Sequence, residues 1–159
     1  MKIEINLKII IALIFFFMFD NVNMYLIFLL FITIHEIAHL VVGLIIGGIP
    51  KKMTISIFGV SMEFYSYKKN KILYKIMFFL IGPLTNIIIG MVCNKILVQN
   101  ELKKNIVFTN YAIGIFNLFP ILPLDGGKIL KEILKKAFGF DCSNKIMIVL
   151  SKFFLITIS

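Results

Sequence analysis

Long apolar runs alternate with short polar segments along most of the chain. The apolar runs cover residues 5–19, 24–46, 72–98, 106–119 and 146–158. An α-helix rises 1.5 Å per residue, so about 20 residues are needed to cross a hydrocarbon core about 30 Å thick. Residues 24–46 and 72–98 reach this length unaided, whereas the shorter runs need stretched or snorkelling ends. The pattern predicts an all-α polytopic membrane protein with about four to five transmembrane helices.

Residues 51–71 follow a different pattern, because apolar and polar side chains alternate there around Phe58 and Gly59. A period of two is typical of a strand, and a central glycine is typical of a turn. We therefore predict a short β-hairpin or re-entrant loop directly after the second helix. A plain interfacial loop is the alternative for the same residues.

Two of the apolar runs are broken by proline and glycine. Residues 82–86 (Gly-Pro-Leu-Thr-Asn) interrupt the third run, and their small residues let a neighbouring helix approach. Asn86 would serve either as a packing residue in a kinked span or directly at a site. Residues 117–127 contain two prolines and two glycines, which cannot continue a helix. Irregular backbone at membrane depth is tolerated only where protein or a water-filled cavity surrounds it, so a buried site is expected there. Residues 128–138 then read as an amphipathic surface helix.

Composition supports a membrane protein and adds an orientation. The 159 residues are 60% hydrophobic and only 16% charged, with a mean hydropathy of +0.99, whereas a soluble domain carries about 25% charged residues. We expect one membrane-embedded domain over residues 1–159. The net charge of +9 comes from lysines that lie between the apolar runs, which favours a topology signal over nucleic-acid binding. Most lysines share the side of the N-terminus, so the N-terminus and the site opening are predicted to be cytoplasmic.

Polar residues interrupt the second run at one place, the motif His35-Glu36-x-x-His39. Positions i and i+4 of a helix share a face, so both imidazoles can reach one metal ion with Glu36 beside it. Zinc suits imidazole ligands, and a zinc-activated water with Glu36 as its base would hydrolyse a peptide bond. The alternative is a polar packing cluster without metal.

A catalytic zinc site takes three protein ligands, and the chain has no further histidine. Asp125 stands out among the acidic residues, because it alone follows an apolar run through a segment broken by proline and glycine. The other acidic residues look interfacial or solvated. The predicted site is therefore His35, His39 and Asp125 around Zn²⁺, with Glu36 as the catalytic residue.

Three segments together resemble the site-2 protease family of intramembrane zinc metalloproteases: the motif at residues 35–39, residues 82–86, and residues 117–127 (Asn-Leu-Phe-Pro-Ile-Leu-Pro-Leu-Asp-Gly-Gly). The last segment is most similar to the sporulation branch, stage IV sporulation protein FB. The resemblance implies His35, His39 and Asp125 as zinc ligands and Glu36 as catalytic base. It also implies a membrane-associated protein substrate, in the sporulation branch the pro-form of a sigma factor. Members of that branch typically continue into further spans and a cytoplasmic nucleotide-sensing domain, which we expect to be absent here.

A protease needs its substrate extended, because helical amides and carbonyls are already paired, and strand addition to a sheet edge holds a peptide open. We expect residues 54–65 to supply that edge and Asn117 to hold the substrate or the developing oxyanion. The candidate substrate-binding residues are Asn117, Pro120, Phe58, Gly59 and Asn86.

Two other classes of function compete with the protease. A truncated, catalytically inactive zinc-binding membrane protein would act by binding a partner or substrate, whereas a metal transporter would need polar residues spread over several spans. The expected partners are a protein substrate, the lipid bilayer and an inhibitory or activating membrane protein, without nucleic acid. The expected location is a bacterial cell membrane or an internal forespore membrane.

Overall fold

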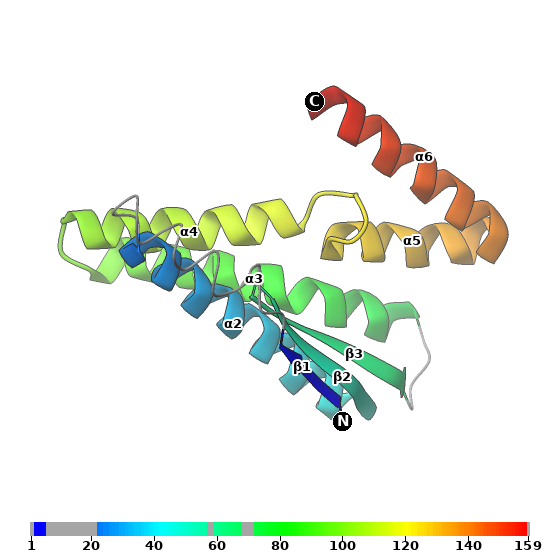
Figure 1. The fold of residues 1–159 in the computed structure, drawn as a ribbon, viewed down its shortest axis with the longest axis horizontal. Helices are drawn as coiled ribbons and strands as arrows, with labels where there is room; N and C mark the ends of the chain where they lie inside the picture. Colours follow the sequence, from blue (N-terminus) through cyan, green and yellow to red (C-terminus); the bar gives the residue numbers. More distant parts are fainter. Residues whose placement is uncertain (1, 6–21, 57–58, 68–71, 159) are drawn as a thin grey trace.

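A computed structural model describes residues 2–5, 22–56, 59–67 and 72–158 (Figure 1). The predicted first span, residues 5–19, lies almost entirely outside the described residues. Two helices, α2 (Val22–Ile45) and α3 (Ile72–Ile96), are long and apolar enough to cross a membrane within the described ranges. The prediction of four to five spans is therefore not tested by the structure.

Helices α2, α3 and α4 (Glu101–Asn117) pack against one another and form the body of the molecule (Figure 1). Phe31 and Ile32 of α2 meet Ile113 of α4 in a buried apolar cluster. Helix α4 begins earlier than its apolar run, because Asn100 caps it: the Asn100 side chain accepts a hydrogen bond from the Lys103 backbone N–H at 2.8 Å. The three-helix packing brings α3 close to both neighbours.

The third apolar run forms a single helix of the length predicted for a span, and α3 continues through residues 82–86 with Pro83 inside it. Gly82 and Pro83 are buried where α3 contacts its neighbours. A Cβ on Gly114 of α4 would lie 2.9 Å from the Pro83 carbonyl oxygen, so the two backbones nearly touch there. Close helix packing of this kind overrides the local tendency of proline to end a helix.

Residues 118–124 turn the chain between α4 and α5 (Asp125–Phe138), which runs beside the first half of α3 (Figure 1). Helix α5 starts at Asp125, three residues before the predicted helix at residue 128. A Cβ on Gly126 would lie 2.1 Å from the Leu118 carbonyl oxygen. The turn therefore folds back onto the first turn of α5, and only a residue without a side chain fits. Helix α6 (Phe140–Ile158) follows directly after Gly139 and begins earlier than its apolar run predicted.

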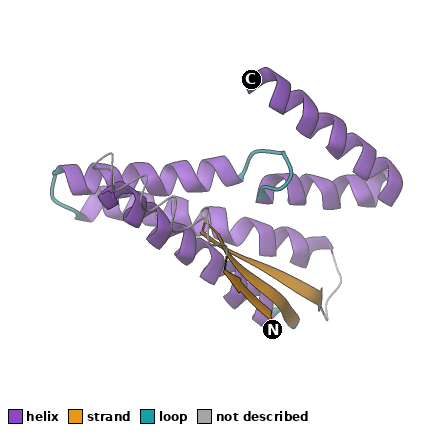
Figure 2. Cartoon of the chain, in the orientation of Figure 1, coloured by secondary structure: helices purple, strands orange, loops and turns teal. Residues whose placement is uncertain are grey.

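A three-stranded sheet lies against α2, with the order β1 (Lys2–Ile5), β2 (Gly48–Ser56) and β3 (Gly59–Tyr67) (Figure 2). Strands β2 and β3 pair antiparallel in the stretch for which the sequence predicted a hairpin or a re-entrant loop. Strand β1 pairs parallel with β2 and was not predicted. The fold is mostly helical, with this small sheet beside the motif helix.

Candidate metal centre

His35, His39 and Asp125 come together in the interior, at relative exposures of 1%, 4% and 4%. The Asp125 Oδ2 atom lies 3.0 Å from His35 Nε2 and 2.9 Å from His39 Nε2, and the two Nε2 atoms are 3.1 Å apart. One turn of α2 supplies both imidazoles, and the first residue of α5 supplies the carboxylate. Ninety residues of chain separate His35 from Asp125, so the turn after α4 closes the site.

The far side of each imidazole shows which nitrogen carries the proton. His39 Nδ1–H donates to the Phe78 carbonyl oxygen at 2.7 Å, and His35 Nδ1–H donates to Asn86 Oδ1 at 3.0 Å. In a neutral imidazole whose Nδ1 is protonated, Nε2 carries only a lone pair. Two bare Nε2 atoms and a carboxylate oxygen therefore converge without a hydrogen between them, an arrangement that a cation stabilises.

The donor set fits a zinc ion. Zinc bonds of 2.0–2.2 Å to nitrogen and oxygen at tetrahedral angles place ligand atoms about 3.3–3.6 Å apart. The three observed separations, 2.9, 3.0 and 3.1 Å, are a few tenths of an ångström shorter than this range, so the ligand atoms would move slightly apart around the ion. Imidazoles that bind metal almost always donate their other N–H to a carbonyl or a carboxylate, as His39 does here. The three side chains each offer one ligand atom, and these atoms all lie within 4.8 Å of one another, which is close enough to hold one metal ion.

Asn86 is fully buried, and its orientation follows from its neighbours. Its Nδ2 group donates to the Phe31 carbonyl oxygen at 3.3 Å and to Asn110 Oδ1 at 3.2 Å. Asn110 Nδ2 in turn donates to the Ile106 carbonyl oxygen at 2.9 Å. Backbone carbonyls thus fix both amides, so the Asn86 oxygen must face His35. The sequence left open whether Asn86 packs or acts at the site, and here it holds an imidazole.

Asn110 was not among the predicted site residues, although it is as buried as Asn86. The signal in the sequence was an amide in the middle of the apolar run 106–119. A polar side chain at membrane depth needs a partner on another helix. Asn110 finds that partner in Asn86, which links α4 to His35 through α3.

Gly82 lets α3 approach the two imidazoles. A Cβ at this position would lie 2.3 Å from His39 Nε2 and 2.6 Å from His35 Nε2, closer than any van der Waals contact. Gly82 thus leaves open the space directly beside the ligand atoms. The sequence singled out residues 82–86 as an interruption of the third run where a neighbouring helix can approach, and the structure places Gly82 at the approach of α3 to the imidazoles of α2.

Two charged residues flank the cluster. Glu36 follows His35 on α2 and is partly exposed. Lys128, one turn after Asp125 on α5, places its Nζ atom 3.0 Å from Asp125 Oδ1, the carboxylate oxygen that faces away from the imidazoles. The carboxylate therefore presents Oδ2 to the imidazoles and Oδ1 to a lysine.

The structure describes three of the remaining predicted substrate-binding residues, Asn117, Pro120 and Gly59. Asn117 is partly buried and donates from Nδ2 to the Ile113 carbonyl oxygen of its own helix at 3.0 Å. Pro120 is exposed in the turn between α4 and α5. Gly59 opens β3 and pairs with Ser56, and Phe58 lies outside the described residues. Their part in substrate binding stays a prediction.

The same architecture occurs in a known structure. The chain matches the site-2 protease from Methanocaldococcus jannaschii with a TM-score of 0.79 at 24% identity, over 98% of this chain and 77% of that one. The fold is therefore that of a site-2 protease, a class of membrane protein. Residues 98–159 match the model of peptidase family M50.

Two curated relatives agree with this class. Zinc metalloprotease MJ0392 of M. jannaschii is 35% identical over 130 residues, which cover 74% of this chain and 37% of that protein. Stage IV sporulation protein FB of Bacillus subtilis is 25% identical over 122 residues, which cover 74% and 42%. The chain thus spans about two fifths of the length of these relatives. Together the matches show that it carries a domain of peptidase family M50, the site-2 protease family, which confirms the predicted family.

Proposed function

We propose that this chain is a zinc endopeptidase that cleaves a membrane-associated protein in or near the membrane. The observation that carries the proposal is the convergence of two imidazole nitrogens and a carboxylate oxygen at 2.9–3.1 Å, with Glu36 next in sequence to one of the imidazoles. The proteolytic class is supported by family M50 and by the relative named zinc metalloprotease.

His35, His39 and Asp125 would hold the zinc ion. When bound, zinc would activate a water molecule for attack on a peptide carbonyl. Glu36 would accept the proton of that water and return it to the leaving amine, because it follows the ligand His35 and is partly exposed. Asn86 and the Phe78 carbonyl would keep both imidazoles in the tautomer that leaves Nε2 free for the metal.

The sheet supplies a place for an extended substrate. Strand order β1-β2-β3 leaves the outer side of β3 without a strand partner within the described sheet. A peptide added at this side would satisfy the free backbone groups of β3 and stay extended for cleavage. We propose that β3 holds the substrate in this way and that Asn117 turns its amide toward the substrate or the oxyanion.

The finer parts of the proposal concern substrate and topology. The relative named stage IV sporulation protein FB supports a sporulation role, with the pro-form of a sigma factor as substrate. The lysine distribution supports a multi-pass protein whose N-terminus and active site open to the cytoplasm. A further membrane protein would inhibit or activate it.

The test compares cells that express the wild-type chain with cells that express Glu36→Gln. This change keeps the shape of the side chain and removes the base. New protein N-termini in the membrane fraction are identified by N-terminal labelling and mass spectrometry, together with the size of a co-expressed, tagged pro-sigma factor.

We expect termini that appear only with the wild-type chain, while both proteins bind zinc equally. Equal zinc content with no termini that depend on Glu36 would instead support the non-catalytic, zinc-binding protein. A shortened pro-sigma factor in both strains would assign its cleavage to another enzyme.

A further inference from the structure

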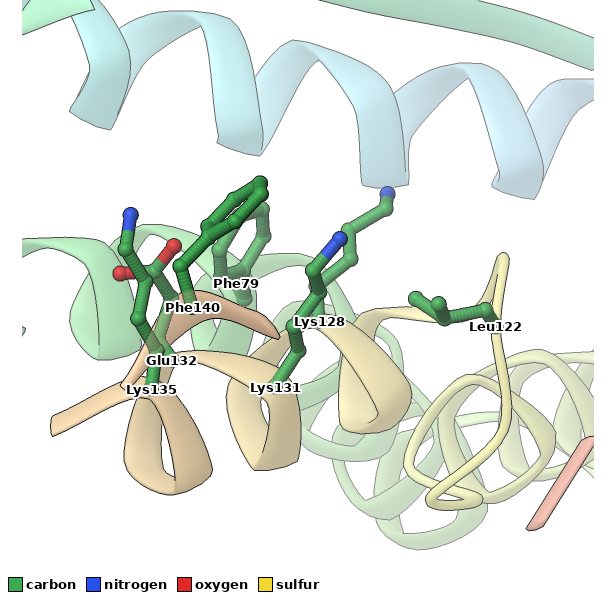
Figure 3. A pocket seen from close by; sticks show the side chains of 7 residues that line it. All are labelled: Phe79, Leu122, Lys128, Lys131, Glu132, Lys135 and Phe140. Carbon is green, nitrogen blue, oxygen red and sulfur yellow. The ribbon is translucent and has the colours of Figure 1, made fainter. Parts of the chain in front are cut away.

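A second polar feature adjoins the metal centre and has no part in the proposed chemistry. A cavity of about 250 Å³ opens beside α5, with room for about eight water molecules. Its lining residues come from α3, the turn after α4, α5 and the start of α6: Phe79, Leu122, Lys128, Lys131, Glu132, Lys135 and Phe140. Figure 3 shows the lysine side chains leaving α5 in the same general direction, with Phe79 and Phe140 between Lys135 and Lys128 and with Leu122 at one end.

The charges in this cavity do not cancel. Lys128 pairs with Asp125, and Glu132 pairs with Lys75 of α3 at 3.0 Å. Lys131 and Lys135 have no carboxylate within ion-pairing distance in the part of the chain that the structure describes. Their Nζ atoms lie 5.9 and 5.3 Å from the centre of the Phe140 ring, so only an aromatic face balances them. The cavity therefore favours an anion.

The cavity and the metal centre share one residue. Lys128 lines the cavity and also donates from Nζ to Asp125 Oδ1, so a peptide bound in the cavity would lie next to the metal centre. Phe79, Leu122 and Phe140 give it apolar walls next to the lysines. A peptide with an acidic residue among apolar ones matches both features better than a free anion does.

We propose that this cavity is an anion-binding subsite that takes an acidic stretch of the peptide substrate beside the metal centre. The proposal rests on the proposed function and adds a substrate preference to it. Lys131 and Lys135 attract the carboxylate, and the aromatic rings hold its apolar neighbours. A substrate with glutamate or aspartate near the scissile bond is then preferred over its amide counterpart.

The test measures peptide binding without cleavage. Its result can therefore be interpreted even if the chain has no protease activity. The full chain with Glu36→Gln is placed in phosphatidylcholine nanodiscs. The probes are a short fluorescein-labelled peptide with a glutamate pair among alanine and serine, and the same peptide with glutamines. Fluorescence anisotropy gives the two dissociation constants for each protein.

The cavity variant carries Lys131→Gln and Lys135→Gln. Its matched control carries Lys136→Gln and Lys145→Gln, which remove the same charge from exposed positions outside the cavity. We expect the chain with all its lysines to prefer the glutamate peptide about fivefold, since partly exposed charge pairs are weak. The preference should vanish in the cavity variant and persist in the control.

Equal binding of the two peptides, or equal loss in both lysine variants, would overturn the proposal. A lipid headgroup is the competing anion, because polybasic segments also bind acidic lipids. The same measurement in nanodiscs with phosphatidylglycerol separates the two. If phosphatidylglycerol abolishes the peptide preference and is enriched around the intact chain but not around the cavity variant, the subsite belongs to a lipid phosphate and the proposal is wrong.

Discussion

Two buried polar clusters lie next to each other in this protein, and only one of them is complete as the chain stands. In the amide pair Asn86 and Asn110, each Nδ2 group has an oxygen acceptor and the two side chains are fully buried. In the cluster of His35, His39 and Asp125, three acceptor atoms face one another. The chain satisfies the first cluster by itself, whereas the acceptor atoms of the second are arranged as a cation would need them.

One hydrogen bond joins the two clusters, from His35 Nδ1 to Asn86 Oδ1. The amide pair donates hydrogen bonds to the backbone carbonyls of Phe31 and Ile106, so it can hold the His35 imidazole in one orientation. Complete polar networks are rigid because every group already has its best partner. The comparison therefore separates the residues that bind a metal from those that keep the binding residues in place.

The largest expected effect comes from removing a ligand. Asp125→Asn keeps the shape of the side chain but lowers its charge, and the amide offers a weaker donor to zinc. Loss of a residue that hydrogen-bonds to a metal ligand typically lowers metal affinity by up to roughly 100-fold. We expect the loss of a ligand itself to lower zinc affinity by more than this. Metal content of the purified protein, measured by plasma mass spectrometry during titration with a chelator, gives the affinity.

The matched control is Asp141→Asn, which changes an exposed aspartate at the start of α6 and should leave zinc affinity unchanged. Wild-type zinc content in Asp125→Asn would show that the cluster is a polar packing group. The comparison between a complete and an incomplete cluster would then be wrong.

A smaller effect is expected from Gly82→Ala, which adds one methyl group beside the ligand atoms. Because the new Cβ would lie 2.3 Å from His39 Nε2, one imidazole must move. We expect zinc affinity to fall by roughly 10- to 100-fold and the free energy of unfolding to fall by about 1–3 kcal/mol. Chelator competition and thermal unfolding in detergent measure the two quantities.

Gly90→Ala on the same helix is the control. Its Cβ would meet Tyr111 Cε1 at 3.2 Å and Asn110 Cβ at an ordinary contact distance of 3.4 Å, and it would meet none of the three ligand residues. A loss of stability without a loss of zinc affinity in Gly82→Ala would mean that α3 moves as a whole and the imidazoles do not.

The sequence predicted the residues of the incomplete cluster because their chemistry is unusual for their surroundings. Two histidines at helical spacing in an apolar run have few structural uses, and Asp125 follows the segment least able to stay helical. The same argument placed the two long helices, whose lengths match a bilayer. Local pattern was sufficient for these features.

Features that depend on contacts between distant segments were not predictable. Strand β1 is only four residues long, and its sequence resembles the start of an apolar run. Its pairing with β2, about fifty residues away, makes it a strand. Helix α3 passes through Pro83 where α2 and α4 pack against it, and the small residues at 82–86 indicate only that a helix can approach, without saying which helices do. The role of Asn110 depends on its hydrogen bond with Asn86, which lies twenty-four residues away in the sequence.

The smallest expected effect tests the link between the clusters through Asn110. Asn110→Leu removes the acceptor of Asn86 Nδ2 and leaves that group short of a partner, at a cost of about 1–3 kcal/mol. Asn86 can then turn over and offer Nδ2 to His35, which would favour an imidazole protonated at Nε2. That tautomer cannot bind metal, so we expect zinc affinity to fall by about tenfold.

A loss of stability alone would not change the tautomer, so ¹⁵N NMR of the His35 imidazole in the metal-free protein is the deciding measurement. Thr109→Val, a change at the neighbouring buried position of α4, controls for general destabilisation. Asn110→Asp keeps an acceptor for Asn86 and should keep the His35 tautomer, although it buries a charge. If Asn110→Leu weakens zinc binding no more than Thr109→Val does, and His35 stays protonated at Nδ1, then the Phe31 carbonyl alone fixes Asn86. The two clusters would then be neighbours without being coupled.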